Sequence, residues 1–195
     1  MTFCATINAV IHSGARPVLA DVEAETYNLD PEQVRRKITT RTKAIIPVHF
    51  AGRACNMGAL TALAQEYDLD VIEDCAHAIE TEYKGRKAGT FGKCGVLSFY
   101  STKNIVTGEG GMVLTNDAEL AARIKRLALH GMSQDAWKRF SDDGYKHYEV
   151  VEVGFKYNMM DLQAAIGMHQ IQRVDSYWKR RQHIWEQYDA AFASF

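Results

Sequence analysis

The segment GVLSFYSTKNIVTGEGGMVLTN, residues 95–116, decides the fold prediction. Its two apolar runs, GVLSFY and GMVLTN, are typical of strands, and hydroxyl side chains, Lys103 and a cluster of glycines lie between them. A strand that only filled a core would not need a lysine just past its end. The connection is too short for a crossover helix, so we expect the two strands to pair antiparallel.

Outside this segment, further strand patterns alternate with helix patterns. The strand candidates are the apolar runs at residues 17–22, 43–50 and 69–75. Alternation of this kind favours an α/β fold with a largely parallel sheet and helices on its faces. We therefore predict a mixed sheet in which the antiparallel strand at 111–116 is the exception.

Helix start signals precede the helical patterns. Asp30 followed by Pro31 indicates an N-cap and a first-turn proline, and Asn56 and Asn116 are N-cap candidates for two later helices. The last 35 residues, 161–195, carry a long amphipathic pattern with no stop signal. A helix of that length usually bridges to another domain or subunit.

Composition and charge limit the function classes. The chain has 195 residues and a net charge of -1, with 23 basic and 24 acidic side chains and no basic run. Such a chain suits one globular domain, and we expect neither nucleic acid nor a membrane as partner. No stretch reaches the roughly 20 apolar residues of a membrane span. Four cysteines without a CxxC pair favour a reducing, cytoplasmic setting.

Polar side chains follow two of the predicted strands, where ligands of open α/β sheets gather. Asp74 and His77 end one strand, and Ser98 and Lys103 end another. Neighbouring strands would bring together an amine for a Schiff base, a carboxylate for a protonated pyridine nitrogen and a ring for stacking. This is the minimum set for pyridoxal phosphate. Ser98 could equally be an ordinary strand residue.

The residue pattern alone leaves other interpretations open. Lys103 could be a surface lysine at a strand end, and Asp74 could cap a short helix. His77 could be a hydrogen-bonded structural histidine. A metal site at Asp74 and His77 would have to recruit His49, because no third ligand has helpful spacing. The glycines of 108–111 more often shape a turn than cradle a phosphate, and they match no nucleotide-binding fingerprint.

The sequence strongly resembles the DegT/DnrJ/EryC1/StrS family, the sugar aminotransferase branch of fold type I pyridoxal-phosphate enzymes. The matching stretches, in family order across nearly the whole chain, are TFCATINAVIHSGARPVLADV, PVHFAG, VIEDCAHAI, GVLSFYSTKNIVTGEGGMVLTN and GFKYNMMDLQAAIG. The resemblance implies a three-layer α/β/α large domain, with the cofactor-binding core at residues 1–160. Residues 161–195 would form a long amphipathic helix that leads toward a small C-terminal domain absent from this chain.

By this resemblance, Lys103 would bind the cofactor aldehyde and act as the general acid and base. Asp74 would pair with the pyridine nitrogen, His77 would stack on the cofactor ring and Phe3 would lie on the opposite face. Ser98 would bind the phosphate. No metal is implied.

The GFKYN loop implies a shared active site. In such enzymes this loop reaches the phosphate of the neighbouring subunit, so Asn158, and less directly Lys156, would make that contact in a homodimer. The implied reaction moves an amino group from glutamate to a keto sugar linked to a nucleotide, at C4 or C3. Relatives that dehydrate sugars replace the lysine, so Lys103 favours aminotransfer.

The resemblance also implies segments that this chain lacks. Relatives begin with a phosphate-binding turn before the stretch that matches TFCAT, and they continue into a small domain. The alternative function is therefore a non-catalytic, cofactor-binding or regulatory remnant of the family. Retention of Lys103, Asp74, His77 and Ser98 together favours the enzyme.

Overall fold

The computed structural model describes residues 1–133 and 148–195. Its contacts divide the chain into two compact units, Met1–Leu114 with Leu162–Phe195, and Thr115–Asp161. The first unit contains the sheet and the residues that follow its strands. The functional division proposed at residue 160 stays a prediction.

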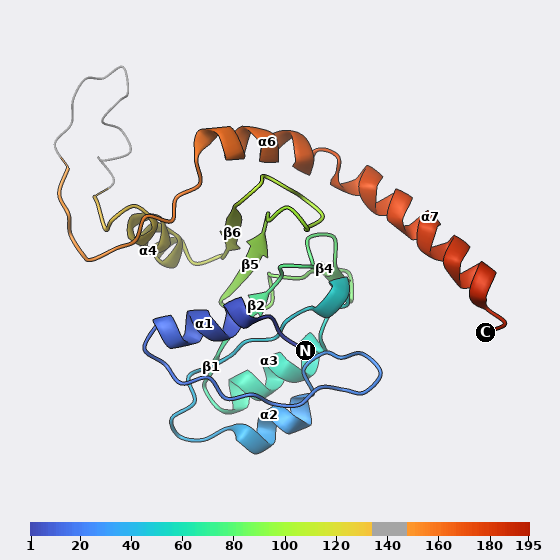
Figure 1. Cartoon of the computed structure of the whole chain (residues 1–195). Helices are drawn as coiled ribbons and strands as arrows, with labels where there is room; N and C mark the ends of the chain where they lie inside the picture. Colours follow the sequence, from blue (N-terminus) through green and yellow to red (C-terminus); the bar gives the residue numbers. More distant parts are fainter. Residues whose placement is uncertain (134–147) are drawn as a thin grey trace. The chain divides into compact units, whose positions relative to one another are not determined.

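The main sheet among the described residues has four strands in the order β1-β2-β5-β6 (Figure 1). They are β1 (Ala44–Ile45), β2 (Asp70–Asp74), β5 (Cys94–Ser98) and β6 (Gly111–Leu114). Strands β1, β2 and β5 run parallel, and β6 pairs antiparallel with β5, with Ser98 opposite Gly111. The mostly parallel sheet and its one antiparallel strand are confirmed.

The strand predicted at residues 17–22 is wrong. Only Val22 pairs there, in an isolated bridge with Leu29. Val18 and Leu19 are 62% and 64% exposed, so the apolar pattern has no packing partner to hold it as a strand. The run at 43–50 is shorter than expected, with a two-residue strand and one further bridge.

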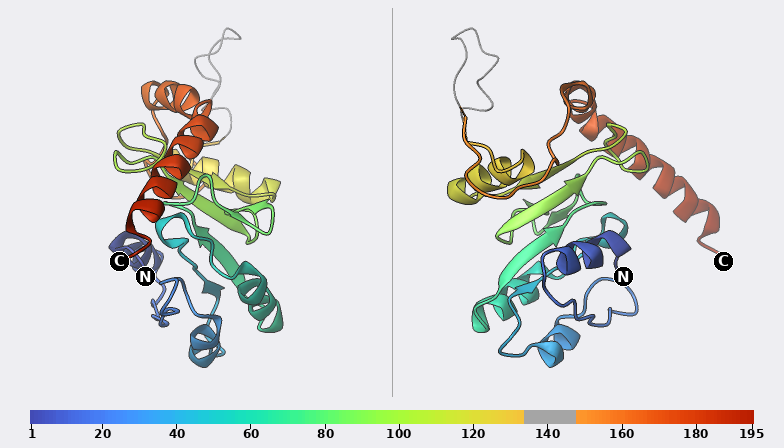
Figure 2. Two further views of the ribbon diagram at one scale, coloured as in Figure 1. Left: turned by 90° about the vertical axis from the view of Figure 1, so that its right-hand side faces the viewer. Right: turned by 60° about the vertical axis from the view of Figure 1, so that its left-hand side comes forward.

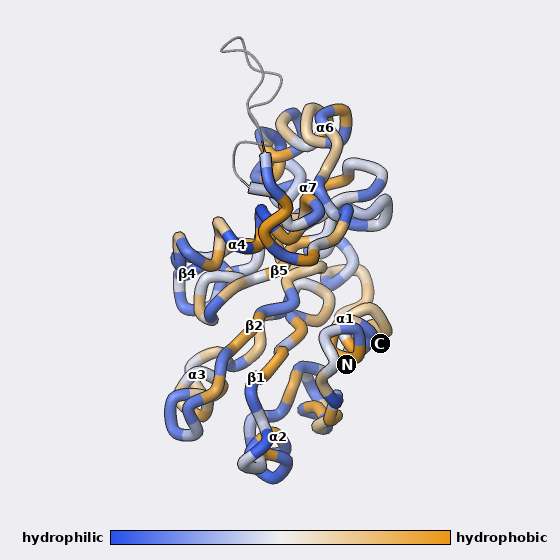
Figure 3. Tube along the Cα trace, turned by 90° about the vertical axis from the view of Figure 1, so that its left-hand side faces the viewer, coloured by the Kyte–Doolittle hydropathy of each residue, from blue (hydrophilic) through white to orange (hydrophobic). Residues whose placement is uncertain are grey.

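Helices cover both faces of this sheet. Figure 2 shows α1 (Cys4–His12) and α3 (Met57–Glu66) on opposite sides of it, as the three-layer prediction requires. Helix α2 (Pro31–Lys37) packs against α3, and Figure 3 shows hydrophobic stretches along β1 and β2. The core of this layer consists of Val34, Ile45, Cys55, Met57, Leu60, Leu63, Ala64 and Val71.

Small elements border the carboxyl ends of the strands. A single 3₁₀ turn, η1 (Phe50–Gly52), follows β1, and a hairpin of β3 (Glu82–Tyr83) and β4 (Arg86–Lys87) lies between β2 and β5. Ala51 in the turn has φ 51°, a left-handed conformation that is uncommon outside glycine. The chain therefore turns sharply just after β1.

The predicted caps agree with the structure at two helices and differ at the third. The Asp30 and Asn56 side chains each accept a hydrogen bond from a first-turn backbone N–H, at α2 and α3. Helix α4 (Ala118–Ala128), in the second unit, is capped by Asp117 and not by Asn116. The Asp117 carboxylate accepts two backbone N–H groups, and an anion there is favoured by the helix dipole.

The single helix expected over 161–195 is two helices, α6 (Asp161–Ile171) and α7 (Val174–Phe192). The break is flanked by β-branched Ile171 and Val174, which have lower helix propensity than straight-chain residues. Neither helix has a buried residue to enforce continuity. Within the described ranges, no helix combines the length and apolarity that crossing a membrane requires.

Candidate active site

Strand β2 ends in two consecutive carboxylates, Glu73 and Asp74. Successive side chains of a strand point to opposite faces. Glu73 is completely buried, whereas Asp74 is half-buried. The two acids are therefore adjacent in the chain but lie in different surroundings, on opposite faces of the sheet.

The Asp74 carboxylate is held by both of its oxygens. Thr6 in α1 donates its hydroxyl to Oδ2 at 2.6 Å, and the backbone N–H of Ala76 donates to Oδ1 at 3.0 Å. The Asp74 backbone also pairs with the segment after β1, through Pro47 and His49. Asp74 is thus fixed on the face of the sheet that carries α1.

A hollow of about 280 Å³ is formed by residues from the turn η1 and from the segments that follow β2 and β5 in the chain. The residues that line it are Ala51, Ala76, His77, Thr102, Lys103 and Asn104. His77 and Lys103, which the sequence places on different strand ends, therefore face one hollow. Lys103 is half-buried, and its backbone N–H closes a turn onto the carbonyl of Tyr100 at 2.9 Å.

The pKa of the His77 imidazole depends on the charges of two other predicted residues, Lys103 and Asp74. Partial burial lowers the pKa of the His77 imidazole below its ordinary value of 6.5, and the positive charge of Lys103 lowers it further. The Asp74 carboxylate acts in the opposite direction. His77 is therefore mainly neutral at pH 7. The Phe50 ring lies 6.5 Å from the His77 ring at an angle of 58°.

Asp74, Ser98 and Phe3 are not among the residues that line the hollow. Ser98 ends β5, and its Oγ accepts a long hydrogen bond from the Tyr100 N–H at 3.4 Å. Phe3 is 70% exposed and directly precedes α1, the helix that supplies Thr6. The structure brings His77 and Lys103 to one hollow, Asp74 acts on His77 electrostatically, and Ser98 and Phe3 are not among the lining residues.

Asn158 belongs to the second unit. Its backbone N–H donates to Ala128, and its side-chain Nδ2 donates to the Met159 carbonyl at 3.4 Å. Its Oδ1 is buried without a hydrogen-bond partner among the described residues. An unsatisfied buried amide oxygen is costly, so this residue has an acceptor to offer. Lys156 is exposed in the same loop.

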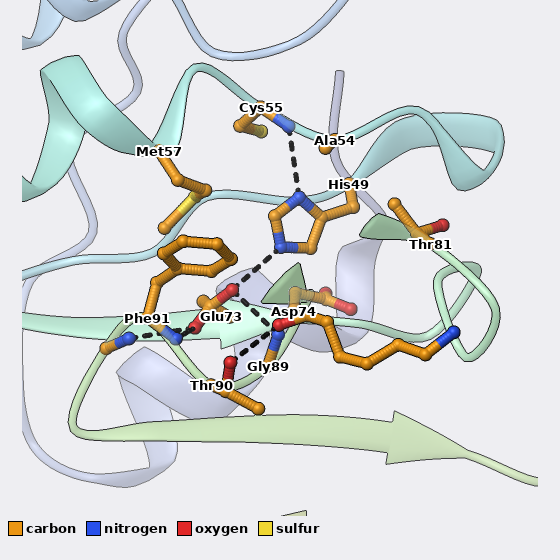
Figure 4. A network of polar contacts seen from close by, with 12 residues as sticks. His49, Ala54, Cys55, Met57, Glu73, Asp74, Thr81, Gly89, Thr90 and Phe91 are labelled. Atoms are coloured by element: carbon orange, nitrogen blue, oxygen red, sulfur yellow. Dashed lines mark hydrogen bonds and ion pairs between the residues drawn. The ribbon is translucent and has the colours of Figure 1, made fainter. Parts of the chain in front are cut away.

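Glu73 organises the opposite side of β2 (Figure 4). Its Oε1 accepts the N–H groups of Phe91 and Gly92, at 2.6 and 2.8 Å. Its Oε2 accepts Gly89 N–H at 2.7 Å and contacts His49 Nε2 at 3.1 Å. Burial alone would raise the pKa of the Glu73 carboxyl, but the hydrogen bonds from His49 and the three backbone N–H groups hold it below its ordinary value.

The ligand atoms of His49, Glu73 and Cys75 all lie within 4.8 Å of one another, a spacing that could suit a metal ion. His49 Nδ1 accepts the Cys55 N–H at 3.1 Å, so Nε2 carries the hydrogen and donates to Glu73. No imidazole lone pair remains for a metal. A metal site at Asp74 and His77 would need His49 as its third ligand, but His49 contacts Glu73 on the other face of β2.

Two residues near the predicted site, Thr6 and Asn104, were not predicted from the sequence. Asn104 directly follows Lys103 and lines the same hollow, so its position in the chain was a usable signal. Thr6 is 68 residues from Asp74, and no spacing rule connects them.

The model of the DegT/DnrJ/EryC1/StrS aminotransferase family matches residues 1–195. The chain belongs to this family. Members are pyridoxal-phosphate-dependent aminotransferases, and the mostly parallel sheet with its helices matches their fold.

Three relatives illustrate the match. The spore coat polysaccharide biosynthesis protein SpsC of Bacillus subtilis is 51% identical over 192 residues, which is 98% of this chain and 49% of SpsC. PseC of Helicobacter pylori, an aminotransferase in pseudoaminic acid biosynthesis, aligns with a TM-score of 0.91 at 32% identity, over 100% of this chain and 50% of PseC.

Spr1654 of Streptococcus pneumoniae, assigned as a sugar aminotransferase, has been solved in a PLP form. It aligns with a TM-score of 0.89 at 31% identity, over 100% of this chain and 52% of its own. A PMP form of the same protein aligns equally well, with a TM-score of 0.90. This chain spans about half the length of the relatives it matches.

Proposed function

We propose that this chain carries the cofactor site of a pyridoxal-phosphate-dependent aminotransferase. It would transfer an amino group from glutamate to a nucleotide-linked keto sugar, in the synthesis of surface polysaccharide or amino sugars. The observation that carries the proposal is the shared hollow of His77 and Lys103, with Asp74 close enough to influence His77 electrostatically. The polysaccharide role of SpsC and the sugar chemistry of PseC support the substrate class.

The residues present fit the cofactor chemically. Asp74 would face the pyridine nitrogen, His77 would lie against the ring, and Lys103 would take the aldehyde. Ser98 would contact the phosphate, and Phe3 would close over the ring from its exposed position. When bound, pyridoxal phosphate supplies an electron sink for the substrate carbon that loses a proton.

Each side chain then has a defined task. Thr6 and the Ala76 N–H fix Asp74, so its negative charge is already oriented and need not reorganise. The lowered pKa of His77 keeps its imidazole neutral at pH 7, which leaves Lys103 as the cationic group of the hollow. Lys103 would act as the general acid and base that moves a proton between the substrate carbon and the cofactor.

We further propose that the site is shared between two subunits. The buried Oδ1 of Asn158 has no hydrogen-bond partner within residues 1–133 and 148–195, which supports a role for this loop as an acceptor. Asn158 would turn its side chain to the phosphate held by a second copy, with Lys156 nearby in the chain. The four cysteines, Cys4, Cys55, Cys75 and Cys94, are free thiols, which supports the proposal of a reducing, cytoplasmic location.

The experiment mixes the purified chain with pyridoxal phosphate, records the visible spectrum, adds glutamate and reduces a parallel sample with borohydride. We expect a visible band that glutamate converts, and a reduced adduct at Lys103 by mass spectrometry. Lys103→Ala should lose the adduct and retain the circular dichroism spectrum, because residue 103 is in a loop. Lys84→Ala, in the turn between β3 and β4, is the matched control.

The outcomes separate the two functions. A band without glutamate conversion favours the non-catalytic binder. Absence of a band, or an adduct that persists in Lys103→Ala, would overturn the assignment of Lys103. A C-terminally extended chain of relative-like length should be tested beside this one, because the relatives are about twice as long.

A further inference from the structure

Glu80 occupies an unusual place beside the hollow. It lies in the segment that leads from β2 to the β3–β4 hairpin, and its side chain is only 6% exposed. A carboxylate this buried is stable only if it is paired and hydrogen-bonded. Each of its two oxygens has a different partner.

The first partner is on α7. Arg181 Nη1 donates to Glu80 Oε1 at 2.9 Å, across 101 residues of sequence. The Arg181 side chain is 39% exposed, so the pair is buried mainly on the Glu80 side. A charge-assisted hydrogen bond of this kind is stronger than a neutral one.

The second partner is next to the proposed cofactor lysine. Asn104 Nδ2 donates to Glu80 Oε2 at 2.8 Å. Asn104 lines the hollow beside Lys103, and the following residue, Ile105, is 2% exposed. The loop that carries Lys103 is therefore fixed by a buried side chain on one side and by Glu80 on the other.

Among the described residues of this unit, the other ion pairs made by Lys or Arg lie at the surface. Arg35–Glu66 has side chains that are 41% and 49% exposed, and Lys93–Asp70 is similarly open. Exposed pairs of that kind contribute little to stability and connect only two surface positions. The Glu80 carboxylate instead links a helix to a loop of the hollow from a buried position.

We propose that Glu80 is a positioning residue that couples α7 to the loop of Lys103. A displacement of Arg181 with its helix changes the hold of Glu80 on Asn104, and thereby the place of the Lys103 amine in the hollow. This inference rests on the proposed function for the meaning of Lys103, whereas the mechanical coupling itself does not require a cofactor.

The first test is hydrogen exchange of the full chain without cofactor. In Arg181→Ala we expect amides of the segment 103–107 to exchange about tenfold faster, as follows from the loss of one hydrogen bond to a charged group. Arg181→Lys should restore most of the protection, because it returns the charge. Arg180→Ala, at an exposed neighbouring position of α7, is the matched control and should leave 103–107 unchanged.

A second variant identifies the relay. Glu80→Ala should itself accelerate exchange at 103–107, and adding Arg181→Ala to it should have no further effect there. If Arg181→Ala accelerates exchange only within α7, or if its effect at 103–107 is undiminished in the Glu80→Ala background, the coupling is refuted.

A third measurement tests whether the coupling between Arg181 and the 103–107 segment affects the bound cofactor. The pH midpoint of the visible band of bound pyridoxal phosphate should differ between Arg181→Ala and the parent chain, and Arg180→Ala should match the parent. An unchanged midpoint in Arg181→Ala would refute the effect on Lys103. If the parent chain binds no cofactor, the proposed function fails, and the exchange experiment still decides the coupling.

Discussion

Glu73 and Asp74 are neighbours on one strand, yet the two sides of β2 that they serve differ in almost every physical respect. Glu73 is completely buried, and each of its oxygens accepts two donors. Asp74 is half-buried, and each of its oxygens accepts one. One carboxylate is saturated, and the other retains acceptor capacity.

The difference shows how a fold separates support from chemistry. The Glu73 side ties two loops to the strand with backbone hydrogen bonds and an imidazole, so the Glu73 carboxylate is fully used in holding the structure. The Asp74 side has fewer bonds and borders a hollow with His77 and Lys103. Rigidity on the first side holds the geometry that the second side needs.

Amide substitutions of Glu73 and Asp74 should have the largest effects, and their effects on the free energy of unfolding should differ. In Glu73→Gln, either orientation of the amide turns its NH₂ toward two N–H donors, so we expect a loss of about 2–4 kcal/mol in the free energy of unfolding. In Asp74→Asn, the hydroxyl of Thr6 can rotate and accept from the new NH₂, so we expect a loss below about 1 kcal/mol. Urea unfolding followed by circular dichroism measures both.

The same pair should behave in the opposite way toward the cofactor. Asp74→Asn removes the charge proposed to face the pyridine nitrogen, so amino transfer should fall roughly 10²–10³-fold. Glu73→Gln that is still folded should retain most of the parent activity per folded molecule. Equal losses of stability in the two variants, or full activity in Asp74→Asn, would contradict the division of tasks.

High pH should lower the free energy of unfolding through two buried thiols, Cys55 and Cys75. Burial raises the pKa of the Cys55 thiol from 9.0 to about 11, and burial and then the charges of Glu73 and Asp74 raise the pKa of Cys75 above its ordinary value. Below pH 9 both thiols are protonated in the folded and unfolded chains, so this contribution is fully present. Above pH 9 the unfolded chain releases protons that the folded chain retains, and stability falls.

We expect the loss to be about 1 kcal/mol per pH unit for each thiol between pH 9 and 11, measured as urea midpoints over a pH series. Cys55→Ala should reduce the slope, and Cys4→Ala, at an exposed position, should not. A slope that is the same in Cys55→Ala and the parent would remove the buried thiol as its source.

The smallest effect concerns the single bond from α1 to Asp74. Thr6→Val keeps the shape of the side chain and removes the hydroxyl that donates to Oδ2. We expect about tenfold weaker cofactor binding, measured by titration of the visible band, with little change in unfolding. Thr6→Ser should bind like the parent, because it restores the donor. Identical affinities in Thr6→Val and Thr6→Ser would show that Thr6 does not position Asp74.

Features that depend on local residue patterns could be predicted from the amino-acid sequence. Strand periodicity placed β2, β5 and β6, capping chemistry located Asp30 and Asn56, and the short glycine-rich connection set the antiparallel pair. Asp74, His77 and Lys103 stood at strand ends, where parallel topology gathers ligands. These inferences work because each of them uses residues that are neighbours in the chain.

Tertiary structure alone decided which distant residues meet. Thr6 reaches Asp74 across 68 residues, and Arg181 reaches Glu80 across 101. Packing also left the apolar run at 17–22 exposed, divided the helix expected over 161–195, and buried Glu73 completely while it left Asp74 half-buried. The physical reason is that burial and long-range hydrogen bonds depend on what surrounds a segment, which its own residue pattern does not contain.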